Sequence, residues 1–144
     1  MALDPLTILV EKEAIRELKA RYFRFLDTKQ WDKWIEIFEP EFEHDMVTEK
    51  QKIHGPREKF VEFVSKALEG VITVHHGHNP EIELTSPTTA KAIWPFSDRL
   101  KPGEGVTRGT SLEGYGHYHE TYVKSEAGWR IKTQLVTRLR LDFI

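Results

Sequence analysis

The densest group of side chains able to do chemistry is residues 75–80, with the sequence HHGHNP. Three of the seven histidines lie there, in a chain that has no cysteine. Because histidine titrates near neutral pH, such a cluster is typical of proton transfer or of metal binding. The alternative is that these histidines are surface or packing residues at the end of a strand.

A metal site is one possibility that the histidines raise. His76, His78 and Glu83 have the spacing of two His and a Glu in the first metal-binding motif of the cupins, and His117 and His119 share one face of a later strand. No second cupin motif follows, and a helical N-terminal third does not suit a jelly roll. We therefore expect no metal site and no cofactor.

Composition favours an ordinary folded domain spanning residues 1–144, with 39% hydrophobic and 31% charged residues. The 21 basic and 23 acidic residues are well mixed and give a net charge of −2, so we expect no nucleic-acid partner. No apolar run approaches the roughly 18 residues of a membrane span. The N-terminus also lacks the basic start and apolar stretch of a signal peptide. We expect a cytoplasmic protein with no membrane partner.

The elements that must position these residues follow an α+β order. Apolar residues at helical spacing predict helices over residues 7–27, 31–38 and 56–68. After Gly70 the pattern predicts strands, over residues 71–78, 81–85, 89–100, 114–124 and 129–142. A tight hairpin is expected at residues 125–128. This order predicts a cone-shaped barrel, in which a curved antiparallel sheet wraps around the long N-terminal helix and leaves an interior.

Residues 101–113 form a long Gly-rich connection, with Gly103, Gly105 and Gly109. Loops of this length are uncommon inside compact domains unless they are functional or disordered. We therefore expect either a mobile lid over a site or a disordered tip.

Two polar residues of the first helix lie where they can border an interior. Tyr22 is on the apolar stripe, and Asp27 follows about 7.5 Å further along the helix axis. The simpler alternatives are a core tyrosine with its hydroxyl at the rim, and an aspartate exposed at the helix end.

The strand over residues 89–100 places Trp94, Phe96 and Asp98 on one face. A carboxylate that is buried beside two large aromatic rings needs a partner, because an isolated buried charge is very costly. Arg138 in the last strand is a candidate partner, although it is equally consistent with a subunit interface.

Several segments together resemble the SnoaL-like branch of the nuclear-transport-factor-2-like superfamily. In chain order they are residues 14–22, 26–27, 31–32, 75–82, 92–98 and 128–138. Within that branch the chain looks closest to the bile-acid 7α-dehydratases, and more distantly similar to scytalone dehydratase and lindane dehydrochlorinase. The dehydratase pattern of a Tyr, an Asp, a strand His, an Asp and a late Arg falls on Tyr22, Asp27, His75, Asp98 and Arg138.

The resemblance implies a cofactor-independent, dehydratase-like lyase that acts on a hydrophobic cyclic hydroxy or keto substrate, such as a steroid or polyketide. His75 would be the general base or acid, and Asp27 would orient it and favour the imidazolium. Tyr22 would donate to a substrate oxygen. Asp98 and Arg138 would form a charge pair that positions the substrate or tunes the site.

We further expect Trp94, Phe96, His78 and His117 to contact the substrate, and the chain to be a homo-oligomer, either a dimer or a trimer. The alternatives are an isomerase or cyclase of the same superfamily, and a non-catalytic cone. That cone would bind a small molecule or act as a partner subunit, like the β-subunits of aromatic-ring dioxygenases. Geometry offers a check: a ring nitrogen of His75 should lie about 2.6–3.2 Å from Asp27 or Tyr22, while His76 points outward.

Overall fold

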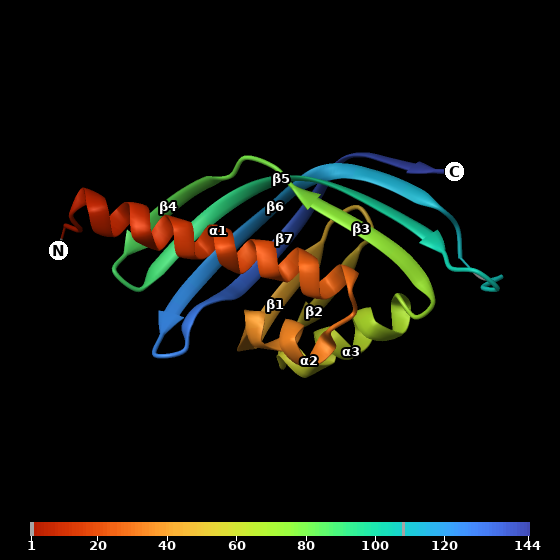
Figure 1. The fold of residues 1–144 in the computed structure, drawn as a ribbon, viewed down its shortest axis with the longest axis horizontal. Helices are drawn as coiled ribbons and strands as arrows, with labels where there is room; N and C mark the ends of the chain where they lie inside the picture. Colours follow the sequence, from red (N-terminus) through yellow and green to blue (C-terminus); the bar gives the residue numbers. More distant parts are fainter. Residues whose placement is uncertain (1, 108) are drawn as a thin grey trace.

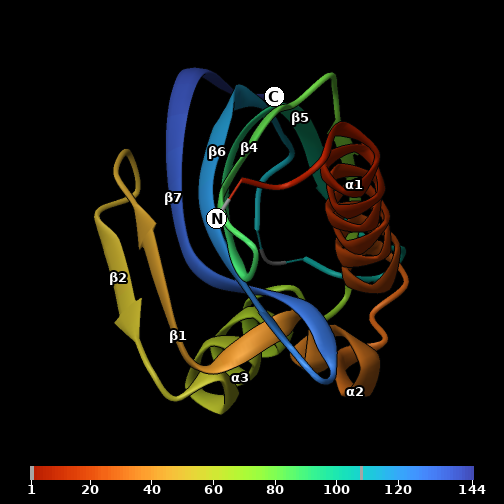
Figure 2. The same ribbon diagram turned by 90° about the vertical axis from the view of Figure 1, so that its left-hand side faces the viewer.

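A long N-terminal helix packed across a curved sheet dominates the computed structural model, which describes residues 2–107 and 109–144 (Figures 1 and 2). The helix α1 (Pro5–Asp27) begins after Asp4, whose carboxylate accepts hydrogen bonds from the Thr7 backbone N–H (3.0 Å) and hydroxyl (2.6 Å). The buried face of α1 carries Ile15, Leu18, Lys19, Tyr22, Phe23, Phe25 and Leu26. A lysine within this apolar stripe requires a buried partner.

In the described residues, seven strands form the sheet, in the order β2-β1-β7-β6-β5-β3, with β4 also paired to β5. The strands are β1 (Phe38–Met46), β2 (Gln51–His54), β3 (Val71–Gly77), β4 (Glu81–Ser86), β5 (Thr89–Pro102), β6 (Leu112–Ser125) and β7 (Gly128–Phe143). The predicted hairpin at residues 125–128 is confirmed, because Ser125 pairs with Gly128, which has φ of 92°. The α+β fold with a long helix and a curved sheet is likewise confirmed.

The prediction of an entirely antiparallel sheet needs a correction. The strand β1 pairs with β7 in parallel, while its other neighbour, β2, is antiparallel. Neither β1 nor β2 was expected, because Pro40 and four acidic residues obscure the alternation of Phe38, Phe42, His44 and Met46. The parallel register places His44 directly beside Gln134 of β7.

Two short helical segments and α3 (Arg57–Ala67) lie at the same end of the sheet as the close of α1 (Figures 1 and 2). The predicted second helix is divided into α2 (Trp31–Trp34) and a 3₁₀ turn (Ile35–Ile37), after which the chain enters β1. Trp34, Phe38 and Phe60 pack ring against ring here, with centroids 4.9–5.4 Å apart. This aromatic cluster covers one end of the interior.

The strands β5 and β6 extend further than expected, so the long connection is reduced to residues 103–111. Leu100 pairs with Leu112 across the two strands. Arg108, within the connection that was predicted as a lid or a disordered tip, lies outside the described residues. Within the residues that are described, no helix is long and apolar enough to cross a membrane.

Candidate active site

A cavity of about 340 Å³ lies between α1, α3 and the inner face of the sheet. Its wall is mainly apolar, with residues from both helices and from β5, β6 and β7, such as Leu26, Phe60, Phe96, Leu112 and Val136. The polar side chains at the wall include Tyr22, His44, Glu49, His75, Asp98, Tyr118, Gln134 and Arg138. This mixture of apolar wall and few convergent polar groups is typical of a small-molecule site.

His75 lies at this cavity and is held by Asp27 at the end of α1. Its Nδ1 lies 2.7 Å from Asp27 Oδ1, and its backbone N–H donates to Asp27 Oδ2 at 2.8 Å. The Thr73 hydroxyl donates to the same carboxylate at 2.9 Å. Because an ionised carboxylate only accepts, Nδ1 of His75 carries a hydrogen, and in the neutral form of the ring the lone pair is on Nε2. The Phe23 ring stacks on the imidazole at 6.3 Å and 17°.

Asp98 lies across from His75 on the neighbouring strand and pairs with Arg138. The two Arg138 terminal nitrogens lie 2.7 and 3.0 Å from the two Asp98 oxygens, a bidentate pair. Arg138 Nε donates to Glu49 at 2.8 Å, and His75 Nε2 lies 4.0 Å from Asp98 Oδ2. Burial acts to lower the pKa of Arg138, but hydrogen bonds and charge from Asp98 and Glu49 raise it overall. We call Asp27, His75, Asp98, Arg138 and Glu49 the His75 cluster.

Glycines make room for this cluster. A Cβ at Gly114, on β6, would collide with the Arg138 guanidinium and with Asp98 Oδ1. A Cβ at Gly77, at the end of β3, would meet the Phe23 ring that stacks on His75. The Asp98–Arg138 pair therefore lies over a strand position that must lack a side chain.

A second polar group lies deeper, where β6 and β7 face α1 and β1. Lys19 Nζ lies 2.7 Å from Glu120, and Gln134 Nε2 donates to the same carboxylate. Gln134 Oε1 lies 2.9 Å from His44 Nδ1 and 3.4 Å from the Tyr22 hydroxyl. Burial is the main cause that raises the pKa of Tyr22, which remains a protonated donor at neutral pH. We call Lys19, Glu120, Gln134, His44 and Tyr22 the Glu120 cluster.

Several of the predicted site residues meet, whereas others lie elsewhere. His75, Asp98 and Arg138 line the cavity, with Asp27 behind His75, and Tyr22 lines it from the Glu120 cluster. The expected distance between Asp27 and His75 is found, and His76 is exposed. Phe96 lines the cavity as expected.

Three predicted substrate contacts require correction. Trp94 shares the face of Phe96 but is not at the cavity wall: it is buried and donates to the Tyr122 hydroxyl at 2.9 Å, so it is part of the core. His78 is exposed near Ser97, because β3 ends before it. His117 alternates with the inward Tyr118 and so lies on the outer face, beside His119.

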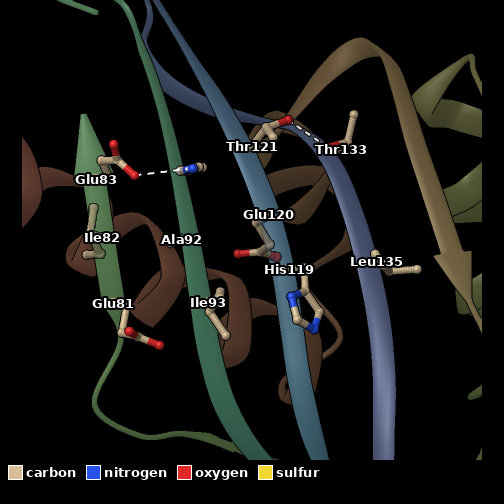
Figure 3. A pocket seen from close by; sticks show the side chains of 11 residues that line it. Glu81, Ile82, Glu83, Ala92, Ile93, His119, Glu120, Thr121, Thr133 and Leu135 are labelled. Atoms are coloured by element: carbon tan, nitrogen blue, oxygen red, sulfur yellow. Dashed lines mark hydrogen bonds and ion pairs between the residues drawn. The ribbon is translucent and has the colours of Figure 1, made fainter. Parts of the chain in front are cut away.

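The outer face of β4, β5, β6 and β7 also carries a hollow, of about 670 Å³ (Figure 3). Figure 3 shows Ile93, His119 and Leu135 side by side on it, with Thr121 and Thr133 hydrogen-bonded nearby at 2.6 Å. Glu83 is paired there with Lys91 at 3.2 Å. None of the five residues of the His75 cluster lines this hollow, so the inner cavity is the better candidate.

Within residues 2–107 and 109–144, no group of three His, Asp or Glu side chains has the arrangement of a metal site. His76 and His78 are exposed, and Glu83 is engaged by Lys91. The spacing that resembled a cupin motif does not bring these residues together as ligands.

Residues that the sequence analysis missed are Glu49, Gly114, His44, Gln134, Lys19 and Glu120. A signal existed for two of them: Lys19 lies on the apolar stripe of α1, and Glu120 shares the inner face of its strand with Tyr118 and Tyr122. His44 and Glu49 lie in or just after β1, which was not expected, so nothing in the local pattern pointed to them.

Known proteins resemble this chain in sequence. The SnoaL-like domain family matches residues 8–134. A protein of Gibberella zeae, named a probable cyclase, is 28% identical over 136 residues, covering 87% of this chain and 89% of its own length.

Solved structures share the fold at lower identity. A protein of Novosphingobium aromaticivorans, provisionally assigned as a scytalone dehydratase, has a TM-score of 0.85 and 22% identity, covering 96% of this chain and 90% of its own. A type 2 hexachlorocyclohexane dehydrochlorinase (LinA) has a TM-score of 0.82 and 18% identity, covering 98% and 93%. The matched family model spans most of the sequence, and the chain therefore belongs to the SnoaL-like domain family.

Proposed function

We propose that this chain is a cofactor-independent lyase that eliminates water from a hydrophobic cyclic hydroxy-ketone, with His75 as the acid–base group. The observation that carries the proposal is the Asp27–His75 pair at an apolar cavity, with Nε2 of His75 free to exchange a proton. Relatives named as a cyclase, a dehydratase and a dehydrochlorinase support chemistry of this kind.

In the proposed reaction, His75 Nε2 takes the proton from the carbon next to the substrate carbonyl. The electron pair of that C–H bond moves into an enolate. The enolate then re-forms the carbonyl and a C=C bond while the C–O bond of the neighbouring carbon breaks. The leaving hydroxyl takes the proton from His75 and departs as water, so His75 returns to its starting state.

The other charged groups favour this proton transfer. Asp27 holds the imidazole orientation and stabilises the imidazolium, as a carboxylate does for other catalytic histidines. Asp98, 4.0 Å from Nε2, adds to that stabilisation, and Arg138 with its second partner Glu49 fixes the position of Asp98.

The test compares His75→Ala with the matched control His76→Ala, in which the neighbouring exposed histidine is removed. Turnover of hydroxy-ketones by His75→Ala should fall about 10²- to 10⁴-fold, the usual contribution of one positioned acid or base. His76→Ala should keep wild-type turnover, and neither variant should be sensitive to a metal chelator. Equal turnover by wild type and His75→Ala, with both folded, would contradict the proposal.

A second candidate is favoured by the relative that is named a probable cyclase. The same proton-transfer groups would serve an isomerase or a cyclase that closes a ring by addition. Mass spectrometry of the product distinguishes them, because elimination removes one water from the substrate whereas isomerisation and ring closure by addition keep its mass.

A further inference from the structure

The Glu120 cluster is a chain of buried hydrogen bonds that starts at the Lys19–Glu120 ion pair. Lys19 and Glu120 are 0% and 2% exposed, and the Lys19 ammonium lies 3.7 Å from the centre of the Tyr22 ring. Burial lowers the pKa of Lys19 to about 8, and its contact with Glu120 opposes this, so the ammonium remains mostly charged at neutral pH. The pair therefore presents Glu120 as a carboxylate that accepts hydrogen bonds.

The carboxylate fixes the orientation of Gln134. Glu120 accepts from Lys19, from the Tyr122 hydroxyl at 2.6 Å and from the Gln134 amide at 2.5 Å. Because a carboxylate has no hydrogen to donate, the NH₂ group of Gln134 must face it. The amide oxygen Oε1 then faces the opposite way, toward His44 and Tyr22.

The orientation of Gln134 in turn fixes the tautomer of His44. His44 Nδ1 lies 2.9 Å from Gln134 Oε1, an atom that only accepts, so Nδ1 carries the hydrogen. Burial is the main cause that lowers the pKa of His44 to about 4, so the ring is neutral at physiological pH. Its other nitrogen, Nε2, therefore bears a lone pair.

That lone pair is available to a ligand. His44 lines the cavity, and among the described residues Nε2 has no hydrogen-bond partner, although the residue is only 3% exposed. In the described residues, the side-chain nitrogens that are fully enclosed and lack a partner are Trp34 Nε1 and Arg57 Nε. His44 Nε2 is not one of them. An acceptor that is held in a single tautomer and open only to the cavity is suited to bind a donor on a bound molecule.

We infer that His44 Nε2 accepts a hydrogen bond from a hydroxyl group of the substrate, so that the site selects cyclic compounds with a hydroxyl away from the reacting centre. The inference deepens the proposed function and rests on the same cavity being the substrate site. Gln134 and Arg138 are four residues apart on one face of β7, about 13 Å along the strand, which separates the two ends of the site.

Tyr22 makes a hydroxyl a better fit than any other oxygen. Its hydroxyl reaches Gln134 Oε1 only at 3.4 Å, so it can donate to a ligand oxygen instead. A ligand hydroxyl can donate to His44 and accept from Tyr22 at the same time, because it has one hydrogen and two lone pairs. A methoxy or carbonyl oxygen would place its lone pairs against the lone pair of Nε2, and the site would reject it.

The test measures binding of 2-naphthol and 2-methoxynaphthalene by calorimetry to wild type, His44→Phe and the matched control His76→Phe, which replaces an exposed histidine. The wild type should prefer 2-naphthol, and His44→Phe should reduce that preference about 2- to 10-fold, the worth of one hydrogen bond. His76→Phe should keep the wild-type preference. An unchanged preference in His44→Phe would overturn the inference, as would a wild type that binds neither compound.

A second measurement does not depend on any variant folding. In ¹⁵N NMR, the ring nitrogens of His44 should show hydrogen on Nδ1, and the Nε2 resonance should shift when 2-naphthol is added but not when 2-methoxynaphthalene is added. Exposed His78 is the internal control and should not respond. A hydrogen on Nε2 of His44, or equal shifts with both compounds, would overturn the inference.

These results separate the inference from the proposed function, because binding and tautomer are measured without turnover. If His75→Ala leaves turnover unchanged while His44→Phe loses the naphthol preference, the proposed lyase fails and the hydroxyl site stands. If His75→Ala abolishes turnover while His44→Phe keeps the preference, the proposed lyase stands and the hydroxyl site fails.

Discussion

The His75 cluster and the Glu120 cluster border the same cavity but differ in how their hydrogen bonds are used. In the His75 cluster, Nε2 of His75 is free and faces Asp98 at 4.0 Å, too far for a hydrogen bond. In the Glu120 cluster, the ammonium and the amide are both hydrogen-bonded to the carboxylate, and His44 Nε2 and the Tyr22 hydroxyl remain available to a ligand.

The difference shows why buried charge alone does not mark a catalytic group. A charge pair that is fully hydrogen-bonded inside the core has a structural role: it orients its neighbours, as Lys19 and Glu120 orient Gln134. A proton-transfer group needs instead a free lone pair at the cavity and nearby charges that favour the protonated form, as around His75.

The largest expected effect on stability is in the Glu120 cluster. Glu120→Gln leaves the Lys19 ammonium buried without its opposite charge, so the free energy of unfolding should fall by about 3–5 kcal/mol in denaturant titrations. The matched control is Glu83→Gln, which removes an exposed partner of Lys91 and should cost less than about 1 kcal/mol. If Glu120→Gln lowers the free energy of unfolding as little as Glu83→Gln does, the Lys19–Glu120 ion pair does not stabilise the Glu120 cluster.

The next largest effect is a loss of folding stability at acidic pH that depends on His44. Its pKa is near 6.5 unfolded and about 4 folded, mainly because of burial; Lys19 adds to the lowering, and Gln134, Asp45 and Glu120 oppose it. Unfolding therefore takes up a proton between these pH values, so stability should fall as the pH drops from 6.5 to 4, by about 3 kcal/mol from this residue.

The measurement is the free energy of unfolding as a function of pH for wild type, His44→Phe and His76→Ala. His44→Phe should lack this part of the slope between pH 6.5 and 4, whereas removal of the exposed His76 should leave the slope as in wild type. An unchanged slope in His44→Phe would contradict a buried neutral histidine.

A smaller effect is expected from Gly114→Ala in the His75 cluster. The added methyl group would displace the Arg138 guanidinium and Asp98, and a misplaced charge pair should lower kcat/KM about 10-fold or more. Ser97→Ala, next to Asp98 but with its side chain toward exposed His78, is the control and should change little. Full activity in Gly114→Ala would show that the Asp98–Arg138 geometry is not needed.

Sequence reasoning located four of the five residues of the His75 cluster, all except Glu49, because they lie on elements with clear patterns. Asp27 closes a regular helix, and His75 and Asp98 lie on strands whose alternation is plain, so the side each residue faces could be predicted. It failed for Trp94, because one face of β5 belongs to the core at Trp94 and to the cavity wall at Phe96, and alternation does not say where along the strand that change occurs.

Apart from Tyr22, the residues of the Glu120 cluster were not predicted, for a different reason. It depends on β1, whose Pro40 and acidic residues hid the strand, and on the parallel pairing of β1 with β7 that brings His44 to Gln134. Such a contact between positions 90 residues apart is a property of the sheet topology. Lys19 on an apolar stripe indicated that a partner existed but not which residue it was.

The central claim, that Asp27 and His75 act as one proton-transfer unit, is tested most directly by a double-mutant cycle on kcat. The single variants Asp27→Asn and His75→Ala and the double variant are compared on a hydroxy-ketone that the wild type converts. We expect strongly non-additive losses, with the double variant little slower than His75→Ala alone, because the carboxylate acts only through the imidazole. Additive losses at the two positions would show that Asp27 and His75 act independently.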